Sequence, residues 1–244
     1  MILDLDIGNT LSKWRLKDTV SSEIRSRGAV WTREEWRPGA DIPDLDIVTA
    51  VRISSVARKQ VLDETVELLR KQVGVVHVAH STREALGVTC GYEEPQRLGV
   101  DRWLGALAGH HLTGGCCSVD CGSAITVDFV LPGGKHLGGY ILPGLRLMKE
   151  SLKLGTRNVA IDPDTEVDTL LAPGRNTVEA VNHGIYMAAV SAVNLWPDMV
   201  YAGLEALYPL TAAERAGRLS GAPDQPRVPD LEKLRSGLAL TQML

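Results

Sequence analysis

Aromatic side chains are scarce in this sequence: they make up 5% of its 244 residues, and phenylalanine occurs once. An excess of positive charge is also missing, since the formal net charge is −4 at pH 7. A chain without overall basic character is not expected to attract nucleic acid through its electrostatic field. No stretch approaches the roughly 20 consecutive apolar residues that span a bilayer, so no membrane segment is expected.

Cysteine is sparse as well, with Cys90, Cys116, Cys117 and Cys121 as the full set. Four clustered cysteines are too few for a disulfide framework, and adjacent residues of a strand point to opposite faces, which hinders shared metal binding. We therefore expect small buried thiols in a reducing cytosol. The chain begins directly with a strand pattern, so no secretory signal is expected either. These features predict a cytoplasmic protein.

The most informative stretch is Val119–Asp128, where an apolar strand ends at Asp120 and leads into a Cys-Gly-Ser turn. A weaker copy, Leu5–Thr10, opens the chain. Glycine permits a tight turn and a close ligand, and consecutive N–H groups in such a turn form an anion-binding concavity. A carboxylate beside an anion site requires a cation between the two. The pair of turns therefore predicts a metal-bridged nucleotide polyphosphate held between two related halves.

Hydrophobic periodicity places strands and helices along the rest of the chain. Strands are expected at residues 2–6, 11–17, 46–51, 75–79, 116–121, 124–131 and 136–142. Helices are expected at residues 56–73, 101–112, 145–154 and 177–196. The strand that follows the first turn excludes a Walker loop and a Rossmann fingerprint, because both place a helix there. Alternation of strands and helices favours an α/β fold.

Three polar positions on the helices keep two interpretations open. Asp101 either stabilises a helix N-terminus or is a carboxylate base. Arg102 is accordingly a solvated partner, or a guanidinium beside that base at the rim of a cleft. Thr177 either caps the last helix or aims its hydroxyl at a substrate. The acidic residues of the loop at 155–175 are expected to form a solvated surface rather than a metal site.

The two turns lie near the starts of two halves, residues 1–114 and 115–244, as a duplicated fold would give. Two such hairpins facing each other across a cleft describe the actin-like (ribonuclease H-like) architecture of sugar and acetate kinases, with mixed sheets flanked by helices. Aspartic proteases also use two D-x-G turns, whose carboxylates share a proton. Those enzymes carry Thr or Ser at the middle position in an all-β setting, whereas Ile7 and Cys121 stand there in this sequence.

Four motifs stand in order along the chain: Asp6–Thr10 with Lys13, Gly99–Arg102, Asp120–Asp128 and Gly138–Gly144. Together they resemble the type III pantothenate kinases. The resemblance runs from residue 1 to about residue 196, and the order and spacing make it specific although each motif alone is weak. Proteobacterial members look especially similar around Tyr92 and after Asp101.

The resemblance implies ATP-dependent phosphorylation of pantothenate, the first step toward coenzyme A, by a homodimer with active sites near the subunit interface. It implies that the nucleotide is bound by Asp6, Ile7, Gly8, Asn9, Thr10, Leu11, Ser12, Lys13 and Ser123. It implies that pantothenate is bound by Tyr92, Gly99, Val100, Asp101, Arg102 and Thr177. Asp101 would be the catalytic base. Asp6 would help hold Mg²⁺, and Asp120 would bind a potassium or ammonium ion.

Elementary chemistry agrees with these roles, because phosphoryl transfer depends on alignment and charge neutralisation. Asp101 would accept the proton of the substrate hydroxyl as its oxygen attacks the γ-phosphorus in line. Lys13 and the cations would offset charge on the transferring group. The planar fork of Arg102 is suited to the substrate carboxylate.

Two positions depart from the family pattern. Ser123 stands where Thr is usual and keeps the hydroxyl. The family's T-G-G-D-A turn near the C-terminus has Ser220–Asp224 as its nearest match, and Pro223 there restricts the backbone and removes an N–H donor. Adenine contacts are therefore expected to be weak or differently built, and no residues are assigned to them.

Two rival functions are considered. A non-catalytic relative that assists transcription should have lost a phosphate-turn or base position, but Asp6, Lys13, Asp101 and Asp120 are all present. A kinase of the same fold that acts on acetate or a sugar would not be expected to carry Tyr92 with the Gly-Val-Asp-Arg motif. The kinase of pantothenate remains the prediction.

Overall fold

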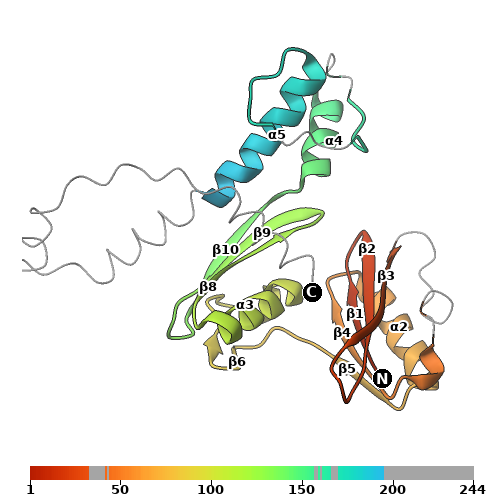
Figure 1. Cartoon of the computed structure of the whole chain (residues 1–244). Coiled ribbons are helices and arrows are strands. Elements are labelled where there is room, and N and C mark those ends of the chain that lie inside the picture. The colour runs from red at the N-terminus through yellow and green to blue at the C-terminus, as the bar shows by residue number, and fades with distance from the viewer. Residues whose placement is uncertain (33–41, 43, 157–158, 160, 166–169, 195–244) are drawn as a thin grey trace, which may run out of the picture. The chain divides into compact units, whose positions relative to one another are not determined.

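The computed structural model describes residues 1–32, 42, 44–156, 159, 161–165 and 170–194 (Figure 1). The chain divides into two compact units. The first comprises Met1–Ser118 and Asp128–Tyr140, and the second comprises Val119–Val127 and the described residues from Ile141 onward. The predicted halves, 1–114 and 115–244, stay a prediction. The predicted turn at Ser220–Asp224 lies outside the described residues.

A five-stranded mixed sheet opens the first unit, with the order β3-β2-β1-β4-β5. Its strands are β1 (Ile2–Ile7), β2 (Leu11–Lys17), β3 (Ile24–Trp31), β4 (Ala50–Ser55) and β5 (Val75–Val78). The first three pair antiparallel, whereas β1, β4 and β5 run parallel. A parallel neighbour requires a crossover connection, which α2 (Lys59–Gln72) supplies between β4 and β5.

One strand boundary was predicted wrongly. Residues 46–51 were expected to be a strand, but Leu45–Ile47 form a short 3₁₀ helix, η1, and the strand begins at Ala50. Asp44, before this helix, has a left-handed backbone with φ of 58°. Leu45 and Val48 are both buried, so the apolar pattern reports packing of this turn rather than an earlier strand.

The hydrophobic core of this sheet lies on the face that α2 covers (Figure 1). Leu3, Leu5 and Ile7 alternate as buried residues along β1 and pack with Leu69 and Val73 at the end of α2. Alternation along a strand sends the residues between them to the opposite face. The two carboxylates of β1 therefore lie on the face away from this core.

The rest of the first unit surrounds α3 (Val100–Thr113), which packs through Trp103, Ala106 and Leu107. It lies against a three-stranded sheet of order β10-β9-β8, formed by β8 (Cys116–Cys121), β9 (Ala124–Val130) and β10 (His136–Pro143) (Figure 1). These three strands run through both units. Before α3 come a small hairpin, β6 (Glu84–Ala85) and β7 (Val88–Thr89), and the 3₁₀ helix η2 (Pro95–Arg97).

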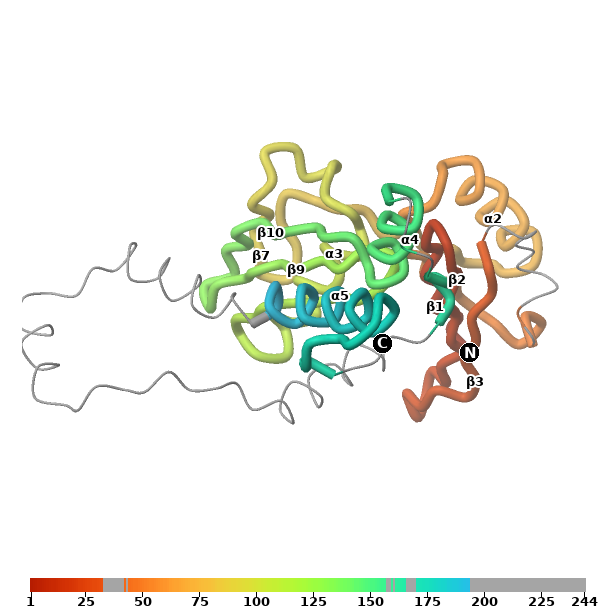
Figure 2. The backbone as a smooth tube through the Cα atoms, turned by 90° about the horizontal axis from the view of Figure 1, so that it is seen from above, coloured from red at the N-terminus to blue at the C-terminus, as the bar shows by residue number. Residues whose placement is uncertain are grey.

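In the second unit, α4 (Leu145–Gly155) and α5 (Thr177–Asn194) lie side by side (Figure 2). The mixed α/β fold with sheets flanked by helices is thus confirmed. No described helix is both long and apolar enough to cross a bilayer. All four cysteines are free, but Cys117 and Cys121 are exposed, so the expectation of buried thiols is wrong for these two.

Candidate active site

The first predicted nucleotide turn connects β1 to β2 in a tight hairpin. The Gly8 N–H donates a hydrogen bond to the Leu11 carbonyl oxygen (3.1 Å), and a Cβ on Gly8 would lie 2.7 Å from that oxygen. The turn therefore requires glycine. The strand register sets Lys13 directly opposite Asp6. Because paired residues have Cβ atoms about 4.5–5.5 Å apart, a cation and a carboxylate flank this turn as neighbours.

The structure separates the remaining residues predicted for this turn into buried and accessible ones. Ile7 and Ser12 are fully buried, and the Ser12 hydroxyl is hydrogen-bonded to that of Thr32 (2.9 Å). Their side chains serve the core, so any contact with a nucleotide would come from their backbone. Asn9 is exposed at the tip, and Thr10 anchors β3 by accepting the Thr32 N–H at its carbonyl oxygen (2.9 Å).

The second predicted turn joins β8 to β9, and the backbone of Gly144 packs against it. Within the turn, the Gly122 N–H donates to the Ala124 carbonyl oxygen (2.9 Å), and the Gly144 N–H donates to the Ser123 carbonyl oxygen (3.1 Å). A Cβ on Gly144 would lie 2.3 Å from the Gly122 carbonyl oxygen. The last glycine of the Gly138–Gly144 motif thus allows close backbone packing that fixes this turn, while Ser123 itself stays exposed.

Asp101 lies in the first turn of α3 and is exposed. Its Oδ1 accepts the backbone N–H of Arg102 (2.8 Å). This is an N-terminal contact of the kind that stabilises both a helix and a carboxylate. A Cβ on the preceding Gly99, the N-cap residue, would lie 2.5 Å from the same oxygen. Gly99 therefore leaves the space that the Asp101 carboxylate occupies.

Arg102 points the other way, into the protein. Its side chain is 5% exposed and forms a two-point ion pair with Asp128 of β9: Nε donates to Oδ2 (2.8 Å) and Nη2 to Oδ1 (2.7 Å). Its Nη1 donates to the Tyr92 hydroxyl (2.8 Å). The interpretation of Arg102 as a solvated partner is therefore wrong. Its predicted pairing with a substrate carboxylate stays a prediction that these contacts do not support.

Charge balance explains the protonation of this buried pair. Burial acts to raise the pKa of Asp128, but hydrogen bonds from His136 and Arg102 outweigh it and hold that pKa below its ordinary value. Burial likewise acts to lower the pKa of Arg102, but Asp128 and Tyr92 raise it above its ordinary value. Asp128 and Arg102 are both charged at neutral pH.

Thr177 begins α5, but the cap of that helix is Asn176. The Asn176 side-chain oxygen accepts the Glu179 N–H (3.0 Å), and a Glu179 carboxylate oxygen accepts the Arg175 N–H (2.8 Å) in return. This pattern resembles a capping box, except that Glu179 accepts the N–H of the residue before the cap. The interpretation of Thr177 as the cap is therefore wrong, and its exposed hydroxyl is not required to stabilise the helix end.

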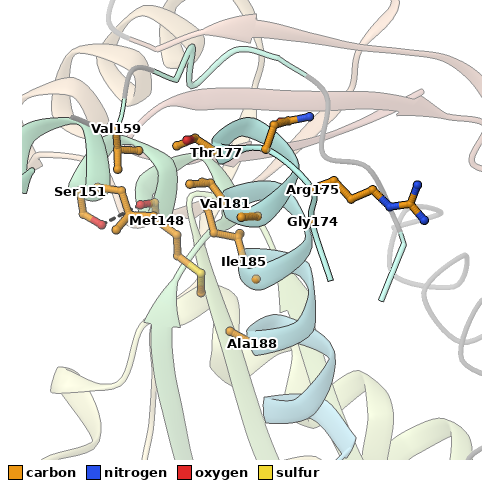
Figure 3. A pocket seen from close by; sticks show the side chains of 13 residues that line it. Met148, Ser151, Val159, Gly174, Arg175, Thr177, Val181, Ile185 and Ala188 are labelled. Carbon is orange, nitrogen blue, oxygen red and sulfur yellow. Dashed lines mark hydrogen bonds between the residues drawn. The ribbon is translucent and has the colours of Figure 1, made fainter. Parts of the chain in front are cut away.

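Thr177 lines an open groove of about 780 Å³ within the second unit. Figure 3 shows that α4 and α5 supply most of its walls, with Met148, Val181 and Ile185 among the apolar side chains. A groove that is mostly apolar, with a few polar groups, is typical of sites for small organic ligands. The predicted contact of Thr177 with substrate stays a prediction.

The described part of the chain does not gather possible cation ligands into one cluster. Among the residues that the structure describes, no three His, Cys, Asp or Glu side chains come together as a metal site. Asp6 belongs to the first unit and the exposed Asp120 to the second. Carboxylate oxygens are the donors that hard cations such as Mg²⁺ prefer, so the chemistry of both residues fits the predicted ions.

Comparison with known proteins settles the family. The family model for the type III pantothenate kinases matches residues 2–196. A type III pantothenate kinase of Chromohalobacter salexigens is 72% identical over the whole of both chains. One of Pseudomonas putida is 38% identical over 95% of both chains. The chain belongs to the type III pantothenate kinase family.

Solved structures resemble this kinase more weakly. A Campylobacter jejuni protein described as a Baf family transcriptional activator is 20% identical, with a TM-score of 0.49 over 79% of this chain and 77% of its own. A Ppx/GppA family member from Aquifex aeolicus is 18% identical, with a TM-score of 0.35 over 62% and 54% of the two chains. Likenesses of this size support no inference about activity.

The structure brings some predicted site residues of the kinase together. Asp6 lies beside Lys13, and Tyr92 is hydrogen-bonded to Arg102. Asp120, Ser123 and Thr177 belong to the second unit, and their relation to the first unit stays a prediction. Two buried residues at the centre of this group, Asp128 and His136, were not predicted from the sequence to have a role. Asp128 stands in the Asp120–Asp128 motif, but no pattern in the sequence indicates His136.

Proposed function

We propose that this kinase transfers the γ-phosphoryl group of ATP to the terminal hydroxyl of pantothenate with Asp101 as the general base. The product is 4′-phosphopantothenate, and the reaction is the first step of coenzyme A biosynthesis. Family membership supports the reaction. The exposed Asp101 carboxylate at the start of α3 is the observation that carries the assignment of the base.

The contacts of Asp101 suit a base. Oδ1 is oriented by the Arg102 N–H (2.8 Å), whereas among the described residues Oδ2 has no hydrogen-bond partner. Oδ2 would accept the proton of the pantothenate hydroxyl while that oxygen attacks the γ-phosphorus in line. Gly99 contributes the space for this orientation.

We assign the nucleotide to the first turn and Ser123. Lys13 is exposed opposite Asp6 and is suited to offset charge on the phosphates. Backbone N–H groups of Asn9 and Thr10 at the tip would add donors to phosphate oxygens. Asp6 would hold Mg²⁺ and Asp120 a potassium or ammonium ion. When bound, these cations would neutralise charge on the polyphosphate.

Pantothenate is assigned to Tyr92, Gly99, Val100, Asp101 and Thr177, while the buried Arg102 contributes through its hydrogen bond to Tyr92. Tyr92 is half-buried and its hydroxyl faces Arg102, so the ring edge and the hydroxyl hydrogen remain for a ligand. We also propose a cytoplasmic homodimer. Exposed apolar side chains on α4 and α5, Leu147, Leu154 and Met187, support an interface on this helix pair.

A coupled assay of ADP release tests the reaction and the base. Wild type should turn over only with pantothenate present and should prefer potassium over sodium. Asp101→Asn keeps the shape of the side chain but loses the basic oxygen. It should therefore lose a factor of roughly 10²–10⁴ in kcat while its melting temperature changes little.

Three outcomes would count against the proposal. Full activity of Asp101→Asn would show that another group is the base. A wild type that binds ATP and pantothenate without turnover would support the regulatory alternative. A wild type that binds neither ligand would contradict the kinase assignment altogether.

A further inference from the structure

Asp128 and His136 form the buried centre of a network to which the reaction described above assigns no role. Asp128 is 2% exposed and His136 is fully buried. Asp128 Oδ1 lies 3.1 Å from His136 Nε2 and 2.7 Å from Arg102 Nη2, and Oδ2 lies 2.8 Å from Arg102 Nε. Three nitrogen atoms on two partners therefore define the position of one carboxylate and, through it, of the guanidinium.

The hydrogen bonds also define the tautomer of His136. The backbone N–H of Gly91 donates to His136 Nδ1 (3.3 Å), so this nitrogen carries no proton. Nε2 must then bear the proton and donate it to Asp128. His136 is therefore a neutral link between Asp128 and the Gly91–Tyr92 segment. The network holds one negative and one positive charge, which balance inside the protein.

The Gly91–Tyr92 segment is held tightly against His136. A Cβ on Gly91 would lie 2.2 Å from the His136 carbonyl oxygen, so only glycine allows this approach. The Tyr92 ring stacks on the imidazole, with centroids 6.4 Å apart and planes 18° from parallel. The Arg102 guanidinium carbon lies 5.6 Å from the centre of the same ring. Tyr92 therefore has little freedom to turn.

The Tyr92 hydroxyl has one direction left for a ligand. Its oxygen accepts the Arg102 Nη1–H (2.8 Å), and among the described residues it has no other hydrogen-bond partner. A phenol is both donor and acceptor, so its own hydrogen remains to be donated. Accepting a charge-assisted bond strengthens such a donor, because hydrogen bonds in a chain polarise one another.

We infer that Asp128 and His136 are positioning residues for pantothenate binding: they fix Arg102 and Tyr92 so that the Tyr92 hydroxyl donates to an acceptor oxygen of the substrate. This inference rests on the proposed function. It makes Arg102 an internal orienting group for Tyr92 rather than a direct partner of the substrate carboxylate. Nucleotide binding is not expected to depend on the network.

A double-mutant cycle on Tyr92→Phe and Asp128→Asn tests this inference. Tyr92→Phe removes only the hydroxyl, and Asp128→Asn keeps the shape but removes the charge that orients Arg102. Each single variant should raise the KM for pantothenate about tenfold, the effect of one lost polar contact, and leave the KM for ATP within about twofold of wild type. The KM for pantothenate of the double variant should be no higher than that of the single variant with the larger increase, because both substitutions remove the same contact.

Controls separate positioning from loss of stability. Glu94→Gln removes a carboxylate from an exposed pair with Arg97 in the same segment and should leave both KM values unchanged. Leu69→Ala opens a cavity in the core under α2 and should lower the melting temperature without changing the KM for pantothenate. If Asp128→Asn fails to fold, His136→Gln serves instead: it retains a donor toward Asp128 and removes the acceptor for the Gly91 N–H. It should also raise the KM for pantothenate.

Additive effects in the double variant would overturn the inference, since Asp128 would then not act through Tyr92. If the variants keep wild-type KM values and lose kcat only in proportion to the fraction of folded protein, the network contributes to stability alone. Wild-type KM for pantothenate in His136→Gln would remove His136 from the mechanism. Failure of the proposed function is distinguishable, because it would appear first as a wild type without pantothenate-dependent ADP release.

Discussion

The replacement of Gly99 by alanine isolates the orientation of the proposed base. Gly99 has φ of −53° and ψ of 133°, a backbone conformation that alanine adopts without strain. The added Cβ would lie 2.5 Å from Asp101 Oδ1 and 3.8 Å from a Val56 methyl group. Only the carboxylate is too close, and it is the end of a rotatable side chain. Gly99→Ala should therefore turn the Asp101 carboxylate away while α3 stays in place.

The distances set the size of the effect. An ordinary contact of a Cβ atom requires about 3.4 Å or more, so Asp101 Oδ1 must move away by roughly 1 Å. A misplacement of about 1 Å at a reacting group can cost about 10²-fold in rate. The cost to stability is smaller, about 1 kcal/mol, because alanine is a poorer N-cap residue than glycine and the bond to the Arg102 N–H is weakened.

The assay is kcat at saturating ATP and pantothenate, with thermal unfolding in parallel. Gly99→Ala should lose 10- to 100-fold in kcat and only a few degrees in melting temperature. The same substitution on the Asp101→Asn background should cause no further loss. Gly74→Ala is the matched control, since a Cβ there meets nothing within 4 Å. Wild-type kcat in Gly99→Ala, or a full additional loss on the Asp101→Asn background, would refute this account of Gly99.

Two further predictions concern stability. Gly144→Ala should lower the unfolding free energy by about 1–3 kcal/mol, since its Cβ would meet the backbone oxygens of the Ser123 turn; urea unfolding with an unchanged midpoint would contradict this. Burial acts to raise the pKa of Asp4, but hydrogen bonds from Arg52 and Arg15 hold that pKa below its ordinary value. The stability that Asp4 contributes is therefore present above about pH 3.9. It is lost as the pH falls through the lower pKa of the folded state. Asp4→Asn should therefore cost on the order of 1 kcal/mol at pH 7 and less at pH 3; the same cost at both pH values would contradict this.

Elements with strong local patterns were predictable from the sequence. The alternation of Leu3, Leu5 and Ile7 gave β1, and the helical spacing of α4 and α5 gave their first residues correctly. The failure at residues 46–51 has a tertiary cause, because Leu45 and Val48 are buried by packing of a turn rather than a strand. β3 was not predicted, since polar and apolar residues do not alternate along Ile24–Trp31 and none of them is buried.

The candidate site divides in the same way. Turn glycines and the acidic residues beside them leave a local pattern, so Asp6, Asp101 and Asp120 could be selected from sequence. His136 left none, and nothing within the Asp120–Asp128 motif indicated a role for Asp128, because their partners Gly91 and Arg102 lie 45 and 26 positions away along the chain. A contact over such separations depends on how β9 and β10 pack against α3. The sequence of either segment alone does not encode it.

The Gly-Val-Asp-Arg motif contains both a residue that the local sequence pattern predicts, Asp101, and a residue whose contacts are distant in sequence, Arg102. Successive residues of an α-helix point about 100° apart, so Asp101 and Arg102 point in different directions. The structure exposes Asp101 and buries Arg102 on Asp128. Removing Asp128 would leave a buried guanidinium without its counter-charge, which is among the more costly changes to a core. Arg102 is therefore better explained as the anchor that fixes the start of α3, with Asp101 on its outer face, than as a mobile arm for the substrate.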